Sequence, residues 1–324
     1  MDSSLLPALH DALTVARHGS VARAAEALSK TPSAVSQQLR RIEAHFGVPL
    51  FEKAGRGIRL SPAGEAFLGP ATRLFDEAES VYGLLDSFSG APVTTVRLAV
   101  SDYLGKELLA PVLRDTFLHG AAALEARRQR KAGGPVEKAF SLRFAISTVH
   151  SADAVRLLEL GQVDAAIVST AAPHPGLDEH LLFEQALQWV ASHREPEVAL
   201  RERLRTEPVL RLAPGSLGRS VLDAWLERHG IEPASTIDVP SVSLLVAYAT
   251  TGCGIGLVPA LPLLDLKTKG LFVEDAGLPP LAVRLAIRPG YPVSAPMAAV
   301  LEHVKARGKA IAEQLTAATT RAGR

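Results

Sequence analysis

The feature that most constrains this chain is a pair of closely spaced helix starts near its amino terminus. Ser20 precedes a short run with apolar periodicity that contains Ala24 and Ala25, and Thr31 with Pro32 begins a second run after a brief turn. Serine and threonine are favoured N-cap residues, and proline suits the first helical position, where its missing N–H costs nothing. Because alanine side chains let a second helix approach closely, the sequence predicts a tight helix pair.

The second of these helices has two chemically distinct faces. One face is apolar and is expected to pack inward, with side chains at Val35, Leu39, Ile42 and Phe46. The opposite face carries short hydrogen-bonding groups in its first turns and cations later. This order is typical of a recognition helix, whose first turns meet base edges while later cations meet phosphates. The candidate DNA contacts on this helix are Thr31, Pro32, Ser33, Ser36, Gln37, Arg40 and Arg41.

A basic hairpin is predicted directly after this helix. Lys53, Arg56 and Arg59 lie around Gly55 and Gly57, and such a hairpin beside a recognition helix forms a wing that reaches the minor groove or the backbone. The whole chain carries a net charge of only +1, with 35 Lys and Arg against 34 Asp and Glu. Residues 30–59, in contrast, hold a net charge of +4. A polyanion is therefore expected to dock locally, on these two elements.

A long helix is predicted from Ser61, which suits an N-cap, and Pro62. Its apolar residues recur in a heptad pattern, the arrangement by which one helix buries a stripe against another helix. Packing of this stripe on the helix's own chain is the alternative. Pro70 is expected to kink the helix or to shift its start, and residues 87–92 are expected to form a hinge-like linker. The stripe consists of Phe67, Ala71, Leu74, Ala78, Val81, Leu85 and Phe88.

After Thr95 the pattern changes to short apolar runs that alternate with helical segments. Buried apolar strands with intervening helices favour a parallel α/β sheet, and about 230 residues is long for one such domain, so two lobes with a cleft are predicted. The basic segment 121–138 is interpreted as an extra helix with a loop. Strands are predicted at 96–101, 142–147, 164–168, 188–191, 209–212, 237–239, 256–258, 271–273 and 283–287, and helices at 104–117, 152–160, 217–228, 243–251 and 297–315.

The amino-terminal residues resemble the LysR-type transcriptional regulators. The family's helix pair, A-A-x-x-L followed by a helix with S-A-V-S-Q-Q-L-R-R-I-E, is matched by Ala24, Ala25 and Leu28 and then by residues 33–43. Many members carry Ser-Gln-Pro at the start of the second helix, where this chain has Thr-Pro-Ser, and arginine in place of Gln37. The operator sequence of a relative therefore does not predict the bases that this chain contacts.

The resemblance implies a division of the chain into three parts. Residues 1–60 would form an all-α winged helix-turn-helix domain that binds DNA, and residues 61–92 a linker helix and hinge that pairs two subunits. Residues 93–324 would form an α/β effector-binding domain of two lobes, like a periplasmic binding protein.

The resemblance also implies an effector site between the lobes, at the carboxyl ends of strands and the starts of helices. Unpaired N–H groups at helix amino termini favour carboxylates and other anions. Asp102 would repel an anionic effector unless its carboxylate is paired. Hydroxyls at strand ends are also common as plain helix caps, so each hydroxyl could either contact the effector or cap a helix. The matching positions are Ser101, Asp102, Ser147, Thr148, Ser169, Thr170, Ser216 and Ser241, with Ser243 on the same helix start as Ser241.

The predicted function is that of a sequence-specific transcriptional regulator whose operator binding is modulated by a small molecule. The implied partners are a double-stranded DNA operator, a small effector such as a carboxylate, further copies of the chain in a dimer or tetramer, and RNA polymerase. No cofactor and no membrane partner is implied. The alternative is a cytoplasmic two-lobed binding protein or enzyme that uses the amino-terminal helices only for dimerisation.

Motifs for enzyme and metal chemistry are weak. The glycine-rich residues 252–256 precede a strand instead of following one, His174 and His180 lack further metal ligands nearby, and no G-x-S-x-G elbow frames Ser147. The single cysteine, Cys253, excludes an intrachain disulfide and fits a reducing compartment. With no signal peptide and no run of about 18 uncharged apolar residues, we expect a cytoplasmic protein that is not an enzyme and holds no metal.

Overall fold

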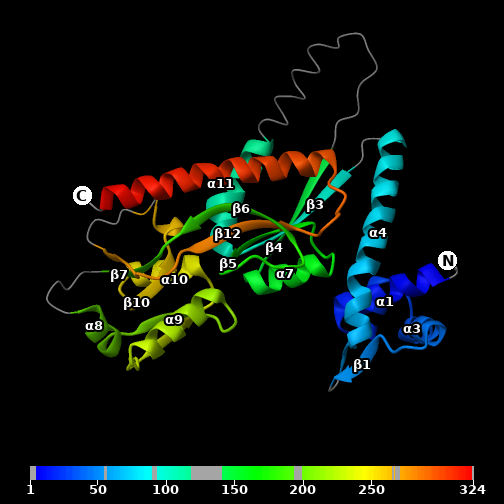
Figure 1. Cartoon of the computed structure of the whole chain (residues 1–324), viewed down its shortest axis with the longest axis horizontal. Helices are drawn as coiled ribbons and strands as arrows, with labels where there is room; N and C mark the ends of the chain where they lie inside the picture. The colour runs from blue at the N-terminus through cyan, green and yellow to red at the C-terminus, as the bar shows by residue number, and fades with distance from the viewer. Residues whose placement is uncertain are drawn as a thin grey trace, which may run out of the picture.

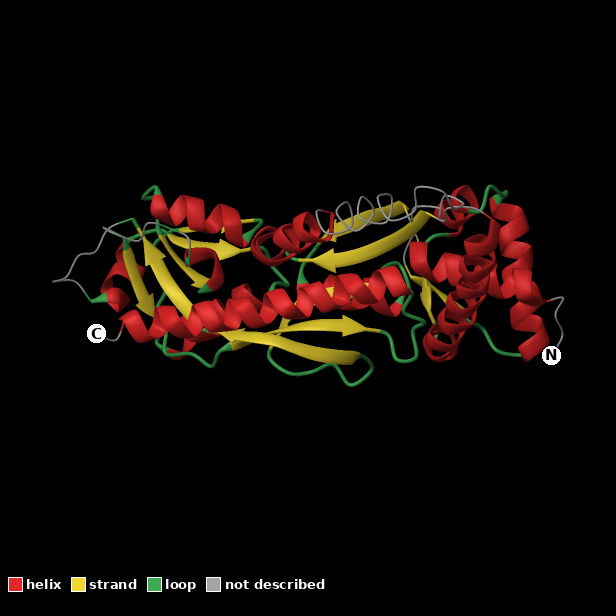
Figure 2. Cartoon of the chain, turned by 90° about the horizontal axis from the view of Figure 1, so that it is seen from above, coloured by secondary structure: helices red, strands yellow, loops and turns green. Residues whose placement is uncertain are grey.

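An amino-terminal helical unit lies at one end of an elongated molecule, and two α/β lobes make up the rest (Figures 1 and 2). The structure is a computed structural model and describes residues 5–54, 57–89, 93–117, 141–192, 199–264, 266 and 271–322. The segment 121–138, for which an extra helix was predicted, lies outside these residues.

The amino-terminal unit follows the predicted caps. It comprises α1 (Leu6–His18), α2 (Val21–Ala27), α3 (Pro32–Phe46), β1 (Phe51–Ala54) and β2 (Gly57–Leu60). The Ser20 hydroxyl accepts a hydrogen bond from the Arg23 N–H at 3.5 Å, and the Thr31 hydroxyl accepts one from the Ala34 N–H at 3.2 Å. The helix pair with its capped starts is therefore confirmed.

The apolar face of α3 is buried over most of its length. Val35, Leu39 and Ile42 pack against Ala24 and Ala25 of α2 in one core cluster. The prediction that Phe46 also packs inward is wrong, because its side chain is 57% exposed and contacts the neighbouring imidazole of His45 edge-on, with ring centroids 4.9 Å apart. Phe46 is the last residue of α3, and the chain turns away at Gly47 in a left-handed conformation.

The linker helix α4 (Pro62–Ser89) begins where the cap residues predict. The Ser61 hydroxyl accepts from the Gly64 N–H at 3.0 Å. The helix continues through Pro70, so the expectation that this proline shifts its start is wrong. The apolar stripe divides: Ala71 is buried on its own chain, whereas Leu74 is 38% and Val81 50% exposed. The side chains of Leu85 and Phe88 lie outside the described part of the structure.

The first lobe is built on a mixed sheet with the strand order β4-β3-β5-β12-β6. β3 is parallel to β4 and β5, whereas β12 is antiparallel to both β5 and β6. The predicted all-parallel arrangement is therefore wrong for part of the sheet. The strands are β3 (Val93–Val100), β4 (Ser141–Thr148), β5 (Ala165–Thr170), β6 (Asp178–Gln185) and β12 (Leu281–Ile287).

The second lobe has the strand order β11-β7-β10-β8-β9. β8 is parallel to β9 and β10, and β7 is antiparallel to β10 and β11. The chain enters this lobe between β6 and β7 and returns between β11 and β12. The strands are β7 (Leu187–Ala191), β8 (Val209–Leu212), β9 (Thr236–Val239), β10 (Ile255–Pro259) and β11 (Phe272–Asp275).

Helices cover both sheets, and α11 runs lengthwise along the pair of lobes (Figure 2). Residues 102–117 form one helical stretch that contains α5 (Asp102–Leu104) and a π-helical turn, η2 (Gly105–Leu109). The remaining helical elements are α7 (Ser151–Glu159), α8 (Leu200–Thr206), α9 (Leu217–Arg228), α10 (Val242–Thr250), the 3₁₀ turn η3 (Leu261–Leu263) and α11 (Ala295–Ala322).

Every strand predicted from the sequence is present, with ends displaced by a few residues, but β6 and α8 were missed. β6 reads DEHLLFEQ, and its polar ends hide the strand pattern because it is an edge strand with one open side. Among the described helices, none is long and apolar enough to cross a membrane.

Candidate functional site

The polar face of α3 points away from the rest of the chain. Ser33, Gln37, Arg40 and Arg41 are exposed and Ser36 is half-buried; we call these five residues the recognition surface. The helix lies at the outer end of the molecule (Figure 1). No segment among the described residues covers the side that a DNA groove would meet.

Thr31 and Pro32, the two other candidates on this helix, hold structural positions. The Thr31 hydroxyl caps the helix, and Pro32 occupies its first turn, where both residues remain exposed. Their contribution to the recognition surface is therefore to fix where α3 begins.

Part of the predicted positive charge is neutralised inside the unit. The Lys30 ammonium group lies 2.7 Å from the carboxylate of Asp11, whose side chain is fully buried. Glu43 is also structural, since its carboxylate accepts from the Leu50 N–H at 2.7 Å and the Phe51 N–H at 3.3 Å. The net charge counted along the sequence thus differs from the charge that faces outward.

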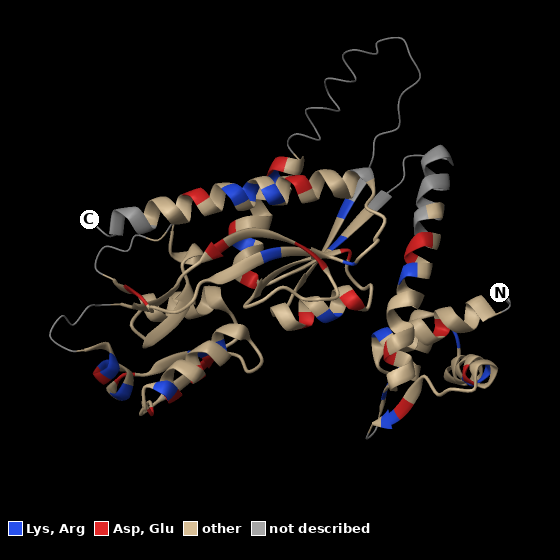
Figure 3. Ribbon diagram, viewed as in Figure 1, with Lys and Arg blue, Asp and Glu red and all other residues tan. Residues whose placement is uncertain are grey.

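The wing is a short antiparallel hairpin in which Ala54 pairs with Gly57. Lys53 is exposed and directly follows Glu52 on β1, a strand on which Figure 3 shows basic and acidic positions side by side. Arg59 forms an exposed ion pair with Glu52 at 3.1 Å. Arg56 lies outside the described residues.

A cavity between the two lobes brings together five of the eight predicted effector positions. We call this cavity the inter-lobe cleft. Its free volume is about 60 Å³, which is room for a few water molecules but not for a metabolite. The lining comprises the predicted Ser101, Asp102, Ser169, Ser216 and Ser241, the unpredicted Tyr103, His150, Ser151 and Gly218, and the apolar Leu187, Leu212, Leu217, Val242, Leu257, Pro259 and Leu281.

The other three predicted positions lie outside this cavity. Ser147 and Thr148 end β4, an edge strand of the first lobe, so the cleft is lined instead by His150 and Ser151 at the start of α7. Thr170 follows Ser169 on β5, and neighbouring strand residues point to opposite faces. The Thr170 hydroxyl accepts from the Arg284 guanidinium at 3.0 Å instead.

Two of the cleft serines are helix caps. The Ser216 hydroxyl accepts from the Arg219 N–H, and the Ser241 hydroxyl accepts from the Leu244 N–H, each at 3.3 Å. In this state these two hydroxyls therefore act as helix caps, which is the alternative to effector binding. The Ser101 hydroxyl differs, because it is buried and has no hydrogen-bond partner in the described part of the chain. Because buried polar groups are normally hydrogen-bonded, this hydroxyl can still form a hydrogen bond with a bound molecule.

Asp102 connects the lobes. Its carboxylate accepts a hydrogen bond at 3.0 Å from the Ser243 N–H, at the amino terminus of α10 in the second lobe. Negative charge at a helix amino terminus is stabilising. The protein thus supplies its own carboxylate to one of the helix starts that border the cleft.

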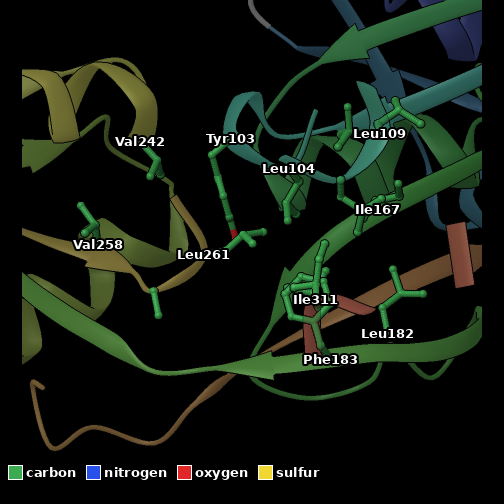
Figure 4. Packing of buried hydrophobic residues seen from close by; sticks show 14 of the residues in the cluster. Tyr103, Leu104, Leu109, Ile167, Leu182, Phe183, Val242, Val258, Leu261 and Ile311 are labelled. Atoms are coloured by element: carbon green, nitrogen blue, oxygen red, sulfur yellow. The ribbon is translucent and has the colours of Figure 1, made fainter. Parts of the chain in front are cut away.

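Tyr103, which the sequence reasoning missed, forms a buried hydrogen-bond network at the cleft. Its hydroxyl lies 2.8 Å from the Ser169 hydroxyl and accepts from the Gln185 amide at 3.0 Å; the Gln185 carbonyl oxygen accepts from the Leu261 N–H at 3.1 Å. Figure 4 shows Tyr103 pointing toward Leu261. Burial raises the pKa of Tyr103 to about 12, so it stays neutral at physiological pH. Its position directly after Ser101 and Asp102 was the only available signal.

The described residues contain no cluster of three or more His, Cys, Asp or Glu that could hold a metal ion. The polar chemistry described for the cleft is therefore that of hydroxyl groups, one carboxylate, one imidazole and backbone amides. Such a set is suited to binding a small polar molecule.

Two family models match the chain. "Bacterial regulatory helix-turn-helix protein, lysR family" covers residues 6–65, and "LysR substrate binding domain" covers residues 137–309. The chain belongs to the LysR family of transcriptional regulators. This LysR-type protein is 30% identical over 280 residues to the transcriptional regulator CfxR of Cupriavidus necator, covering 82% of this chain and 80% of the relative. It is 29% identical over 314 residues to PcaQ of Agrobacterium fabrum, covering 89% and 91%.

Solved structures of similar proteins share the fold of this LysR-type protein. ArgP from Mycobacterium tuberculosis gives a TM-score of 0.67 at 21% identity, covering 95% of this chain and 97% of that one. Full-length LysG from Corynebacterium glutamicum, with bound effector Arg, gives 0.62 at 20% identity, covering 94% and 97%. This protein is thus a DNA-binding transcriptional regulator with a two-lobed effector-binding domain, and its relatives are regulators, not enzymes.

Proposed function

We propose that this LysR-type regulator reads operator bases with Ser33, Ser36 and Gln37, while cations on α3 and the wing bind the phosphates. The supporting observation is that the recognition surface is open while the opposite face of the same helix is buried in the core of the unit. Side chains in the first turns of a recognition helix reach base edges, and later cations meet the backbone. The proposed phosphate contacts are Arg40, Arg41, Lys53, Arg56 and Arg59, with Thr31 and Pro32 placing the helix start.

A mobility-shift titration with the DNA upstream of the protein's own gene tests this proposal. We expect saturable, salt-sensitive and sequence-selective binding. Arg228→Ala is the control for loss of a surface arginine outside the DNA-binding unit, because Arg228 is exposed at the end of α9 in the second lobe. Absence of selective binding at every moderate salt concentration would favour the alternative in which the amino-terminal helices serve only dimerisation.

The proposed effector is a small carboxylate that is bound in the inter-lobe cleft. The uncapped first turn of α7, beside Ser151, offers backbone N–H groups, and the vacant Ser101 hydroxyl lies in the same cavity. The described lining contains Asp102 and contains no lysine or arginine. Because a dianion would find no countercharge there, the proposal favours a monocarboxylate or a zwitterion such as an amino acid.

Binding of such an effector requires the lobes to move. The free volume of the cleft in this state, about 60 Å³, is far below that of an ordinary ligand site, so a ligand would select a more open arrangement of the same domain. A thermal-shift comparison of monocarboxylates, amino acids and dicarboxylates on the full chain tests the proposal. We expect stabilisation by the first or second group that is lost in Ser101→Ala. Stabilisation only by dicarboxylates, or stabilisation that persists in this variant, would contradict the assignment.

The remaining parts of the proposal concern assembly and setting. Residues 1–60 would bind DNA, residues 61–92 would pair two subunits through Leu74 and Val81 on α4, and residues 93–324 would bind the effector. A two-fold pair of linker helices presents two recognition helices to two half-sites, and two such pairs would form a tetramer. The regulator would act in the cytoplasm, where its DNA lies, and would influence RNA polymerase at the promoter.

A further inference from the structure

The DNA-binding unit contacts the first lobe of its own chain through a small set of polar contacts. The Arg17 guanidinium, at the end of α1, donates to the Leu160 carbonyl at 2.7 Å, and the Gln162 amide donates to the Arg17 carbonyl at 2.7 Å. Asp76 of α4 forms an ion pair with Arg288, which directly follows β12. Figure 1 shows α1 and α4 next to one end of α7.

The Asp76–Arg288 pair is buried on both sides, with side-chain exposures of 5% and 6%. The Arg288 guanidinium donates to the Asp76 carboxylate at 2.6 and 3.0 Å, and to the carbonyls of Leu158 and Val163 at 2.8 Å each. It also lies over the Tyr291 ring, 4.6 Å from the centroid. Arg288 therefore holds α4 and the end of α7 together, and removal of one partner leaves a buried charge uncompensated.

α7 connects this contact with the inter-lobe cleft. Its first residue, Ser151, lines the cleft and accepts from the Ser169 N–H at 3.0 Å. The carbonyls of Leu158 and Leu160, at its other end, receive the two arginines of the contact. Nine residues of α-helix span about 13 Å. A displacement of the cleft end of this short helix would therefore also move the carbonyls that the two arginines contact.

The contact is limited in extent and closely packed at one point. A groove of about 990 Å³, lined by both units, runs beside it. The units approach each other closely at Gly161, since an added Cβ would lie 2.6 Å from the Thr72 methyl group and 2.7 Å from the Arg17 guanidinium. Its φ of +65° also favours glycine.

We propose that Asp76, Arg288 and α7 form a docking latch that holds the DNA-binding unit against the first lobe and couples the inter-lobe cleft to the direction of the recognition helix. The coupling, but not the docking, rests on the proposed function. The latch assigns Asp76, Arg288 and Gly161 as positioning residues for DNA binding, although none of them lies near the recognition surface.

The experiment uses Gly161→Asn as a wedge in the full chain. Asparagine tolerates a positive φ, so the substitution mainly adds a side chain to the contact. Gly230→Asn is the matched control, because Gly230 follows α9 with a φ of +59° and has no atom within 4 Å of an added Cβ. Asp76→Asn is a second variant that removes the ion pair without changing the lobe.

Docking is measured with cysteines at His18 and Glu159, in a Cys253→Ser background, joined by a short bismaleimide. His18 and Glu159 are exposed and directly adjoin Arg17 and Leu160, which are hydrogen-bonded to each other across the contact. We expect a crosslink within one chain whose yield falls at least five-fold in Gly161→Asn and Asp76→Asn and is unchanged in Gly230→Asn. A crosslink between chains, or a yield that neither variant changes, would overturn the latch.

Coupling is measured by operator affinity in a double-variant cycle of Ser151→Ala, at the cleft end of α7, with Asp76→Asn. We expect the combined effect to differ at least two-fold from the product of the single effects, whereas Ser151→Ala with Arg228→Ala is multiplicative. If the unmodified protein forms the crosslink but the effects of Ser151→Ala and Asp76→Asn on operator affinity multiply, the coupling is overturned. Loss of selective DNA binding in the unmodified protein would instead refute the proposed function, and the crosslink would still test the docking.

Discussion

The recognition surface and the inter-lobe cleft are assembled in opposite ways. The recognition surface comes from one continuous helix, α3, and lies open in a single chain. The cleft is assembled from segments between residues 101 and 281, from both lobes, and has a free volume of only about 60 Å³. The first depends on helix periodicity and caps, whereas the second depends on how distant strand ends meet. This difference explains why local sequence reasoning predicts the exposed face of α3 but only part of the lining of the cleft.

The two regions also differ in what their polar groups do. On α3 the side chains of the recognition surface are exposed or half-buried, where a partner can reach them. In the cleft, Asp102, Ser216 and Ser241 already satisfy helix amino termini, and Tyr103 with Ser169 forms a closed network. A ligand therefore has to compete with internal hydrogen bonds in the cleft, which makes effector binding a choice between two arrangements.

The sharpest test of the local pattern on α3 compares two residues of its predicted apolar face. Ile42→Ala should destabilise the protein by about 2–5 kcal/mol, because Ile42 is 1% exposed and its truncation leaves a cavity. Phe46→Ala should cost below about 1 kcal/mol, because that side chain is largely in solvent. Denaturant unfolding of the two variants checks this. Equal losses would show that Phe46 is covered in the assembled protein.

On the recognition surface, Gln37→Ala should weaken operator binding by about 1–3 kcal/mol and relax selectivity at the bases it contacts. Arg40→Ala should weaken all sequences alike and reduce the dependence of log affinity on log salt by about one unit. Competition titrations at several salt concentrations separate the two effects. Uniform weakening by both variants would assign Gln37 to the backbone instead of the bases.

In the cleft, Tyr103 predicts a loss of stability at high pH. Its folded-state pKa of about 12 exceeds its ordinary value near 10, so the unfolded chain loses the proton first and stability falls as pH rises from 10 toward 12. The slope from this group is about 1.4 kcal/mol per pH unit. Denaturant unfolding at pH 9.5 and 11 should show a smaller decline in Tyr103→Phe than in the parent protein. The same decline in both would place the phenol in solvent.

The smallest predicted effect concerns the start of α3. Thr31→Ala removes the N-cap and should cost about 1 kcal/mol of stability, whereas Thr31→Ser should cost little because serine caps equally well. Ser33→Ala, two residues later on the exposed face, is the control for loss of a hydroxyl. Thermal unfolding measures all three. If Thr31→Ala and Ser33→Ala were equal, the cap would not hold this helix in solution.

Where the sequence misled, the missing information was a long-range contact. Ser147 and Thr148 were assigned to the cleft because they follow a strand, but that strand forms the edge of its sheet. Thr170 turned to the opposite face from Ser169 and bonds to Arg284. β6 was missed because its polar residues suit an edge strand, which has one open side. The order of strands in a sheet cannot be predicted from any single segment.

The sequence by itself determined the helix pair, its caps, the polar and apolar faces of α3 and the alternation of strands and helices, because each follows from residues within one or two turns of each other. The tertiary structure decided which strand ends border the cleft, that Asp102 caps a helix of the other lobe, and that Arg288 meets Asp76. Those contacts join residues more than one hundred positions apart. They arise only when whole elements pack, so no local spacing encodes them.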